Sequence, residues 1–255
     1  MLEGETGMIV NKKYEILDSD TVKSSDGRTL KRIRAIVAIA AIRVQPGDLG
    51  GYIEVESNLQ VSGDAWVSGN AWVYGDAWVY GDAQVSGDAW VYGDAQVSGD
   101  AQVSGDAQVS GDAQVYGDAQ VSGDAWVYGN AQVYGDAQVS GDAQVSGDAQ
   151  VSGDAQVSGN AWVYGNAQVS GNAQVELRTH IGWLSIVGSE NGTLTWFRSK
   201  SGIRVNRGCF NGTLAEFEEA VSKTHSDNQT AREYRCLIDF IRLRSAGFSY
   251  EGADT

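Results

Sequence analysis

Hydrophobic and polar positions follow a six-residue period through the middle of the chain. From Val61 to Val175 a valine occurs at every sixth position, and each unit reads Val-(Ser/Tyr)-Gly-(Asp/Asn)-Ala-(Gln/Trp). Nineteen complete units fill residues 61–174. Alternation in a run such as Ala-Trp-Val-Tyr predicts a short strand with alanine and valine on one face. Gly-Asp or Gly-Asn then predicts a corner, because these residues tolerate a positive φ.

Strands this short predict a coil that stacks on itself rather than a sandwich. In such a coil valine and alanine lie inside, and each strand pairs with the strands one turn above and below. Degenerate units extend the phase outward, over 49–60 and over 175–186. At about 4.8 Å per turn, the interval 49–186 predicts a rod of roughly 35 Å.

The outward residues predict three units, and therefore 18 residues, in each turn. One column contains the aromatic residues Trp72, Tyr74, Trp90, Tyr92, Trp126, Tyr128, Trp162 and Tyr164. A second column contains Ser68, Ser86, Ser104, Ser122, Ser140 and Ser158, and a third contains Tyr80, Tyr116 and Tyr134 with serines between them. Three distinct faces follow, although duplication of a gene segment would leave the same spacing.

The unit resembles the hexapeptide repeat of left-handed parallel β-helices, where an aliphatic residue leads and a small residue follows four places later. More specifically, the chain resembles phage and prophage hexapeptide-repeat proteins of acetyltransferase-like description. This closer resemblance includes residues 13–17, 47–54 and 208–214. It implies triangular coils of 18 residues. The wider family includes many acyltransferases, whereas most of the phage relatives have no established activity.

Together these features predict a mainly β protein, with a left-handed parallel β-helix of about 7–8 triangular turns over 49–186. Residues 1–48 are expected to form a leader, over 1–7, and a small β-rich N-terminal cap. Asp26-Gly27 is the hairpin signal of that cap.

Residues 187–255 are expected to form an α+β C-terminal cap. Its expected elements are strands over 193–198 and 203–207, a helix from 213 to about 222, and a helix from about 228 to 244. Thr213 and Glu216 have the spacing of a capping box at the start of the first helix.

Charge is concentrated in the repeat. The chain has a net charge of −15, and residues 49–174 contain 16 acidic residues without a single Lys or Arg. Such a surface attracts basic partners and repels bare nucleic acid and anionic membranes. We expect an acidic ridge that includes Asp94, Asp100, Asp106, Asp112, Asp118 and Asp124. The alternative is that aspartate and asparagine simply suit the corners and keep the protein in solution.

The aromatic column is a second candidate surface. A large exposed aromatic patch is typical of an interface. It is compatible with a seam between copies of the chain, a surface for another partner or a stacking platform. Tryptophan and tyrosine also favour strands without any binding role.

Catalytic candidates are few. Hexapeptide acyltransferases typically use a histidine as base, and this chain has only His180 and His225. Neither has an evident carboxylate partner, and no loop interrupts the repeat. A basic hairpin is a further candidate for nucleotides or RNA, because its cations alternate with aromatic residues. Its basic residues are Arg198, Lys200, Arg204 and Arg207.

The sequence therefore predicts a non-enzymatic, phage-type binding protein in the host cytoplasm. Its acidic helix would engage a host protein, either a basic one or one that handles nucleic acid, as a DNA mimic or an inhibitor of defence. The alternatives are a hexapeptide acyltransferase that uses acetyl-CoA and a structural rod that self-associates through its Trp/Tyr face. We expect a homo-oligomer, no resident cofactor or metal, no membrane contact and no direct nucleic-acid contact on the helix.

Overall fold

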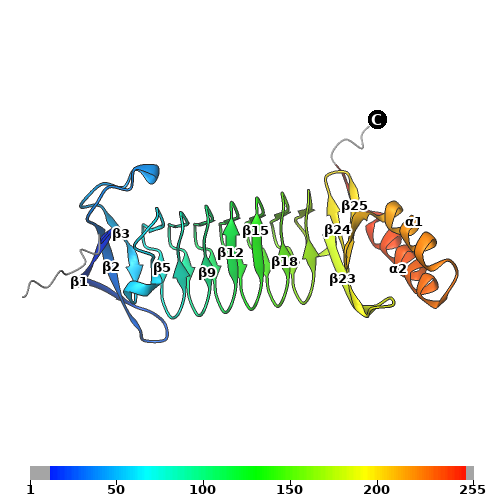
Figure 1. Ribbon diagram of the computed structural model, residues 1–255, viewed down its shortest axis with the longest axis horizontal. Coiled ribbons are helices and arrows are strands. Elements are labelled where there is room, and N and C mark those ends of the chain that lie inside the picture. The colour runs from blue at the N-terminus through cyan, green and yellow to red at the C-terminus, as the bar shows by residue number, and fades with distance from the viewer. Residues whose placement is uncertain (1–11, 251–255) are drawn as a thin grey trace, which may run out of the picture.

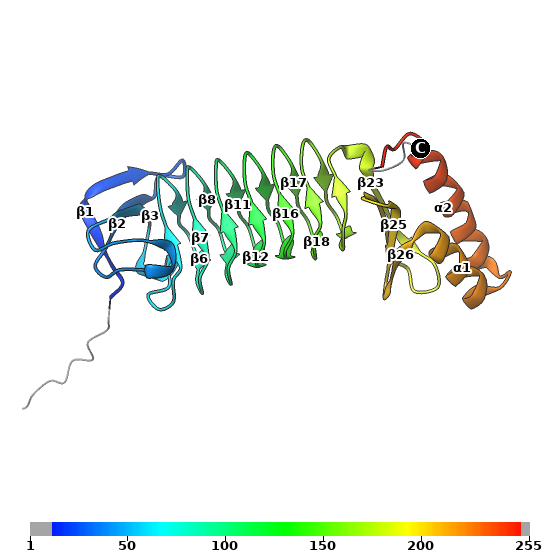
Figure 2. The same ribbon diagram turned by 90° about the horizontal axis from the view of Figure 1, so that it is seen from above.

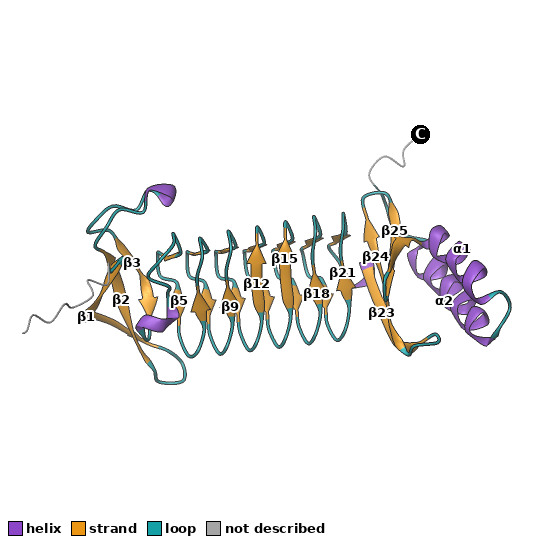
Figure 3. Ribbon diagram, viewed as in Figure 1, coloured by secondary structure: helices purple, strands orange, loops and turns teal. Residues whose placement is uncertain are grey.

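The computed structural model describes residues 12–250 and shows three parts along one long axis (Figure 1). An N-terminal β cap, a parallel β-solenoid and a C-terminal cap with two helices follow one another in chain order. The mainly β fold class is confirmed, and both α-helices of the described residues lie in the C-terminal cap, while the N-terminal end has only the short 3-10 helices Ala40–Ile42 and Glu56–Asn58 (Figure 3). The leader expected over 1–7 lies outside the described residues.

The N-terminal cap is built on a long hairpin. Strands β1 (Tyr14–Lys23) and β2 (Thr29–Ala35) pair antiparallel, and Gly27 in the turn has φ +86°. β2 also pairs antiparallel with β3 (Leu49–Ile53), which in turn pairs parallel with the solenoid. β3 therefore joins the cap sheet to the first turn. The expected hairpin is confirmed.

The solenoid has three parallel sheets, which we name by their outward side chains. The aromatic face comprises β5 (Trp72–Val73), β8 (Trp90–Val91), β11 (Gln108–Val109), β14 (Trp126–Val127), β17 (Gln144–Val145) and β20 (Trp162–Val163). The serine face comprises β4 (Trp66–Val67), β7 (Gln84–Val85), β10 (Gln102–Val103), β13 (Gln120–Val121), β16 (Gln138–Val139), β19 (Gln156–Val157) and β22 (Gln174–Val175). The third face comprises β6 (Trp78–Val79), β9 (Gln96–Val97), β12 (Gln114–Gly117), β15 (Gln132–Gly135), β18 (Gln150–Val151) and β21 (Gln168–Val169).

The register of these sheets confirms three units per turn. Each strand pairs with the strand 18 residues away, so that Val91, Val109 and Val127 lie above one another. Seven strands stack on the serine face, which corresponds to about 7 turns.

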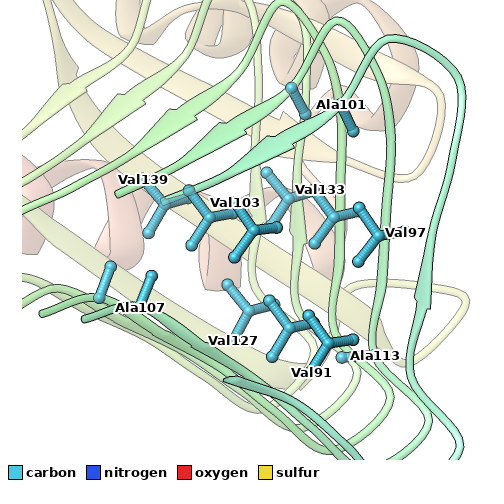
Figure 4. Packing of buried hydrophobic residues seen from close by; sticks show 14 of the residues in the cluster. Val91, Val97, Ala101, Val103, Ala107, Ala113, Val127, Val133 and Val139 are labelled. Carbon is cyan, nitrogen blue, oxygen red and sulfur yellow. The ribbon is translucent and has the colours of Figure 1, made fainter. Parts of the chain in front are cut away.

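The solenoid interior consists of valine and alanine. From Val67 to Val163 every valine and every alanine of the repeat is at most 1% exposed, and their side chains form rows along the axis (Figure 4). The corners need glycine for a steric reason. Gly111 has φ +68°, and a Cβ placed there would lie 3.0 Å from the backbone nitrogen of Gly129, one turn away.

The repeat ends earlier than the sequence indicates. The unit expected over 181–186 is instead part of β23 (Ile181–Val187), which pairs antiparallel within the C-terminal cap. A short 3-10 helix, Arg178–His180, separates it from the last turn. The physical reason is the loss of the Gly-Asp corner after Val175, without which the chain cannot begin another turn.

The C-terminal cap is a four-stranded antiparallel sheet with two helices on its outer side (Figure 2). The sheet continues with β24 (Gly192–Ser199), β25 (Gly202–Arg207) and β26 (Phe210–Thr213), and the helices are α1 (Leu214–His225) and α2 (Gln229–Ser245). Thr213 and Glu216 form the expected capping box. Helix α1 continues three residues beyond the end expected at about 222, and His225 is its last residue.

Both caps close the ends of the solenoid core. Tyr14 and Ile33 from the N-terminal cap, and Ile181 and Phe197 from the C-terminal cap, belong to the same buried cluster as the valines. The open ends of the stack are therefore covered by apolar side chains, as a solenoid requires.

Candidate binding surface

The aromatic face presents one outward column along the whole solenoid. From the N-terminal end this column contains Tyr52, Trp72, Trp90, Gln108, Trp126, Gln144 and Trp162. A parallel column, two residues further along each strand, contains Tyr74, Tyr92, Ser110, Tyr128, Ser146 and Tyr164. The structure thus brings the predicted aromatic residues to one face.

Aromatic residues in adjacent turns stack on each other. The rings of Trp72 and Trp90 are 4.9 Å apart and tilted by only 1°. Tyr74 and Tyr92 are 5.2 Å apart, with an angle of 6°. Because the rise between turns is close to a stacking distance, neighbouring rings fill the space between them.

The N-terminal end of this face is covered, which corrects the expectation of a continuous exposed stripe. Tyr74 is only 5% exposed and packs with Leu30 of β2 and with Tyr52. Burial raises the pKa of Tyr74 to about 12. The hairpin of the cap folds over this part of the face, which the repeat pattern alone does not indicate.

The middle of the face is open. Trp126 is 46% exposed and Tyr128 is 38% exposed. Trp126 has Gln108 one turn before it and Gln144 one turn after it. The exposed aromatic residues are therefore separated by turns with smaller or polar side chains.

Slots open where a serine turn separates two tyrosine turns. A cavity of about 180 Å³ is lined by Tyr128, Gln144, Ser146, Trp162 and Tyr164. The third face repeats this arrangement, with a cavity of about 210 Å³ lined by Tyr80, Gln96, Ser98, Gln114 and Tyr116. By contrast, Tyr116 and Tyr134 occupy adjacent turns and stack at 5.0 Å.

A guanidinium covers the ring at each end of the aromatic column. The Cζ atom of Arg32, from the N-terminal cap, lies 4.2 Å from the ring centre of Tyr52. The Cζ atom of Arg178 lies 3.6 Å from the ring centre of Trp162. Both distances are well within the range of cation–π attraction.

The acidic residues form three ridges, not one. The leading ridge, before the aromatic strands, contains Asn70, Asp88, Asp106, Asp124, Asp142 and Asn160, and the trailing ridge, after them, contains Asp76, Asp94, Asp112, Asn130, Asp148 and Asn166. The far ridge contains Asp64, Asp82, Asp100, Asp118, Asp136, Asp154 and Asn172. The six aspartates predicted as one ridge lie two on each, because successive units occupy successive corners of an 18-residue turn.

Side-chain contacts along the ridges support this assignment. The Asn70 amide donates to the Asp88 carboxylate at 3.2 Å, and the Asn130 amide donates to the Asp148 carboxylate at 2.9 Å. Asparagine at a corner therefore replaces carboxylate repulsion with a hydrogen bond. The leading and trailing ridges flank the aromatic face on its two sides.

A larger hollow continues the aromatic face into the C-terminal cap. It has a volume of about 720 Å³. Its lining includes Trp162, Tyr164, Arg178, Trp183 and Arg244. It shares Trp162 and Tyr164 with the smaller slot. No sequence pattern indicates this hollow, because Arg178 and Arg244 lie far apart in the chain.

The basic hairpin does not form a free cationic face. Arg198 is 7% exposed, and its Nε donates to the carbonyl oxygen of Ser249 at 2.8 Å. Arg207 donates to the carbonyl oxygen of Val187 at 2.8 Å, and Arg204 donates to Asn211 at 2.6 Å. These three guanidinium groups hold the cap together, and only Lys200 of the predicted set is fully exposed.

The two histidines lie in structural positions. The Nδ1 atom of His180 accepts the backbone N–H of Glu176 at 3.3 Å, and the ring packs edge-on against Phe248 at 5.1 Å. Burial, with the nearby Arg198 guanidinium, lowers the pKa of His180, while the Glu176 carboxylate opposes that shift. The ring of His225 lies 5.9 Å from the Tyr234 ring.

His180 makes the C-terminal cap sensitive to acid. Because its pKa is lowered by folding, the unfolded chain binds its proton more readily, and stability falls as the pH drops below the ordinary histidine value. We expect the melting temperature of the wild type to fall more between pH 7 and pH 5 than that of His180→Asn, which keeps an acceptor but does not titrate. Melting followed by tryptophan fluorescence checks this. Parallel curves for the two proteins would contradict it.

Residues 12–250 contain no cluster of three or more His, Cys, Asp or Glu side chains able to hold a metal ion. Within the same range, no helix has both the length and the apolar character needed to cross a membrane. Cys209 and Cys236 are free and exposed.

The fold and its surfaces define a β-solenoid repeat protein. A family model described as "YdcK Beta solenoid repeat" matches eleven segments between residues 59 and 171. The matched segments are 59–75, 65–81, 83–99, 95–111, 101–117, 113–129, 119–135, 131–147, 137–153, 149–165 and 155–171. Each has 17 residues, close to one turn of the solenoid. A comparison with curated proteins finds no match.

Proposed function

We propose that the chain is a non-enzymatic binding protein whose acidic solenoid engages a basic partner protein. The observation that carries this proposal is the arrangement of charge around the aromatic face. Carboxylates line both of its edges, and residues 49–174 contain no Lys or Arg that would neutralise them. Such a field concentrates cationic partners at the surface and speeds their association. The resemblance to phage and prophage repeat proteins extends the proposal to a host protein in the host cytoplasm.

Basic peptides of defined composition test this proposal. We expect labelled octa-arginine or octa-lysine to bind at low ionic strength and octa-glutamate not to bind. Raising the ionic strength from about 0.02 M to about 0.5 M should weaken binding about tenfold or more, because salt screens exposed charges. Fluorescence anisotropy measures both effects.

A pair of matched variants locates the site. Asp106→Asn, Asp112→Asn, Asp142→Asn and Asp148→Asn together remove four charges beside the aromatic face. Asp82→Asn, Asp100→Asn, Asp118→Asn and Asp136→Asn together remove four from the far ridge, and the repeat itself uses asparagine at these corners. We expect the first set to weaken binding more than the second. Failure of both cationic peptides to bind at low salt would overturn the proposal.

A further inference from the structure

We infer that the aromatic face binds arginine side chains of an extended basic segment, with one guanidinium in each of two slots. The repeat places the first slot over Ser110, between Tyr92 and Tyr128, where the Tyr92 hydroxyl lies 3.5 Å from the side-chain oxygen of Gln108. The second slot lies over Ser146, between Tyr128 and Tyr164. This inference rests on the proposed function and names the chemistry of its partner.

The second slot is an observed hollow of about 180 Å³ between aromatic rings. Its floor is the short side chain of Ser146, where an adjacent tyrosine would have filled the space by stacking. The turn of Ser110 repeats the same sequence, with Gln108 in place of Gln144. A flat group that enters the second slot meets aromatic rings on both sides.

The neighbouring Trp/Gln column of the same face already holds guanidinium groups. Arg32 covers the ring of Tyr52 at one end, and Arg178 covers the ring of Trp162 at the other, at 3.6 Å. Between these ends, Trp126 is 46% exposed. The face therefore binds an arginine to an aromatic ring at each end and leaves Trp126 open in the middle.

The negative charge around the slots favours binding of a cationic group over binding of a second copy of the chain. The rings of one copy have the spacing to enter the slots of another, because both repeat every two turns. However, two such faces would bring four rows of corners together, and residues 49–174 of each copy carry a net charge of −16. The turns of both slots have aspartate at both corners: Asp106 and Asp112 for the first, Asp142 and Asp148 for the second. A guanidinium in a slot therefore lies between carboxylates.

The distance between the slots favours a polyproline II segment. Two turns of the solenoid rise by about 9.6 Å. Three residues of polyproline II rise by about 9.3 Å and bring side chains i and i+3 to the same side. In a β-strand, residues i and i+3 point to opposite sides. The partner we infer is therefore an Arg-x-x-Arg segment that runs along the solenoid axis.

Short labelled peptides test the chemistry and the spacing. We expect a peptide containing Arg-Pro-Pro-Arg to bind more tightly than its Lys-Pro-Pro-Lys counterpart by about threefold to tenfold for each slot, because guanidinium stacks on rings better than ammonium does. Arg-Pro-Arg, with the same charge but a shorter spacing, should bind less tightly than Arg-Pro-Pro-Arg.

Filling the slots tests the site without removing any aromatic ring. Gln108→Trp with Ser110→Tyr, and Gln144→Trp with Ser146→Tyr, use residues that the repeat already places at these positions. Each pair should lower the affinity for Arg-Pro-Pro-Arg, and all four together should leave only the weak affinity of the lysine peptide. The matched control, Gln96→Trp with Ser98→Tyr, fills the slot of the third face and should change nothing. Circular dichroism verifies that each variant folds.

The outcomes separate this inference from the proposed function. If arginine and lysine peptides bind equally and filling the slots has no effect, the slot inference is overturned while acidic binding stands. If no cationic peptide binds, both fall. If light scattering shows a dimer that the slot-filling variants dissociate, the occupant is a second copy, and the arginine inference is wrong.

Discussion

Replacement of Val115 by aspartate is expected to unfold the middle of the solenoid. Val115 lies in β12, is fully buried, and pairs with Val97 and Val133 in the turns on either side. A carboxylate at this position faces only valine and alanine, without a partner. The expected loss in the free energy of unfolding is about 5 kcal/mol at pH 7. Because each turn contacts only its neighbours, a central defect separates the two halves of the stack.

The adjacent outward position provides the control. Gln114→Asp adds the same charge at a half-exposed side chain of the same strand, and we expect a loss below about 1 kcal/mol. Denaturation followed by circular dichroism measures both. The buried carboxyl must have a raised pKa, so the defect should diminish as the pH falls toward 5. Equal stability of the two variants would show that the valines do not form the interior.

The solenoid could be predicted because its determinants are local and repeated. Valine, alanine and the Gly-Asp corner specify strand, interior and turn within each six-residue unit, and 19 copies give the same result. The C-terminal end of the solenoid was predicted less accurately. The residues of 181–186 keep an aliphatic residue at the expected positions, but their strand pairs with β24 of the cap, which lies later in the chain.

The sequence predicts which residues share a column of the candidate surface, but it does not predict which parts of that surface the caps cover. Spacing by 18 residues correctly groups Trp126 with Trp90 and Trp162. The same spacing divides the aspartates among three ridges, so the prediction of one ridge from six consecutive aspartates is wrong. The cover over Tyr74, and the guanidinium groups at both ends of the column, depend on cap residues whose contacts no repeat pattern encodes.

The C-terminal cap depends on one aromatic side chain that enters the end of the solenoid. Phe197 of β24 is fully buried and belongs to the core cluster of the solenoid rather than to that of the cap helices. Ile181 and Trp183 add apolar contact at the same junction, and polar contacts complete it, such as the Asn206 amide, which donates to the carbonyl oxygen of Gln168 at 2.9 Å. Loss of Phe197 removes the largest fully buried apolar side chain of this junction.

Phe197→Asp is accordingly expected to detach the C-terminal cap while the solenoid stays folded. The free energy of packing between the cap and the solenoid should weaken by about 4 kcal/mol or more. Trypsin reports this directly, since no Lys or Arg lies between Arg43 and Arg178, and the expected product is a resistant fragment that ends at Arg178 and contains the whole solenoid. The uncovered strand edges should then associate end to end, which light scattering detects. Leu243→Asp, on a 78% exposed residue of α2, is the control and should leave the cap attached. A Phe197→Asp protein with wild-type digestion and mass would mean that the cap is held by other contacts.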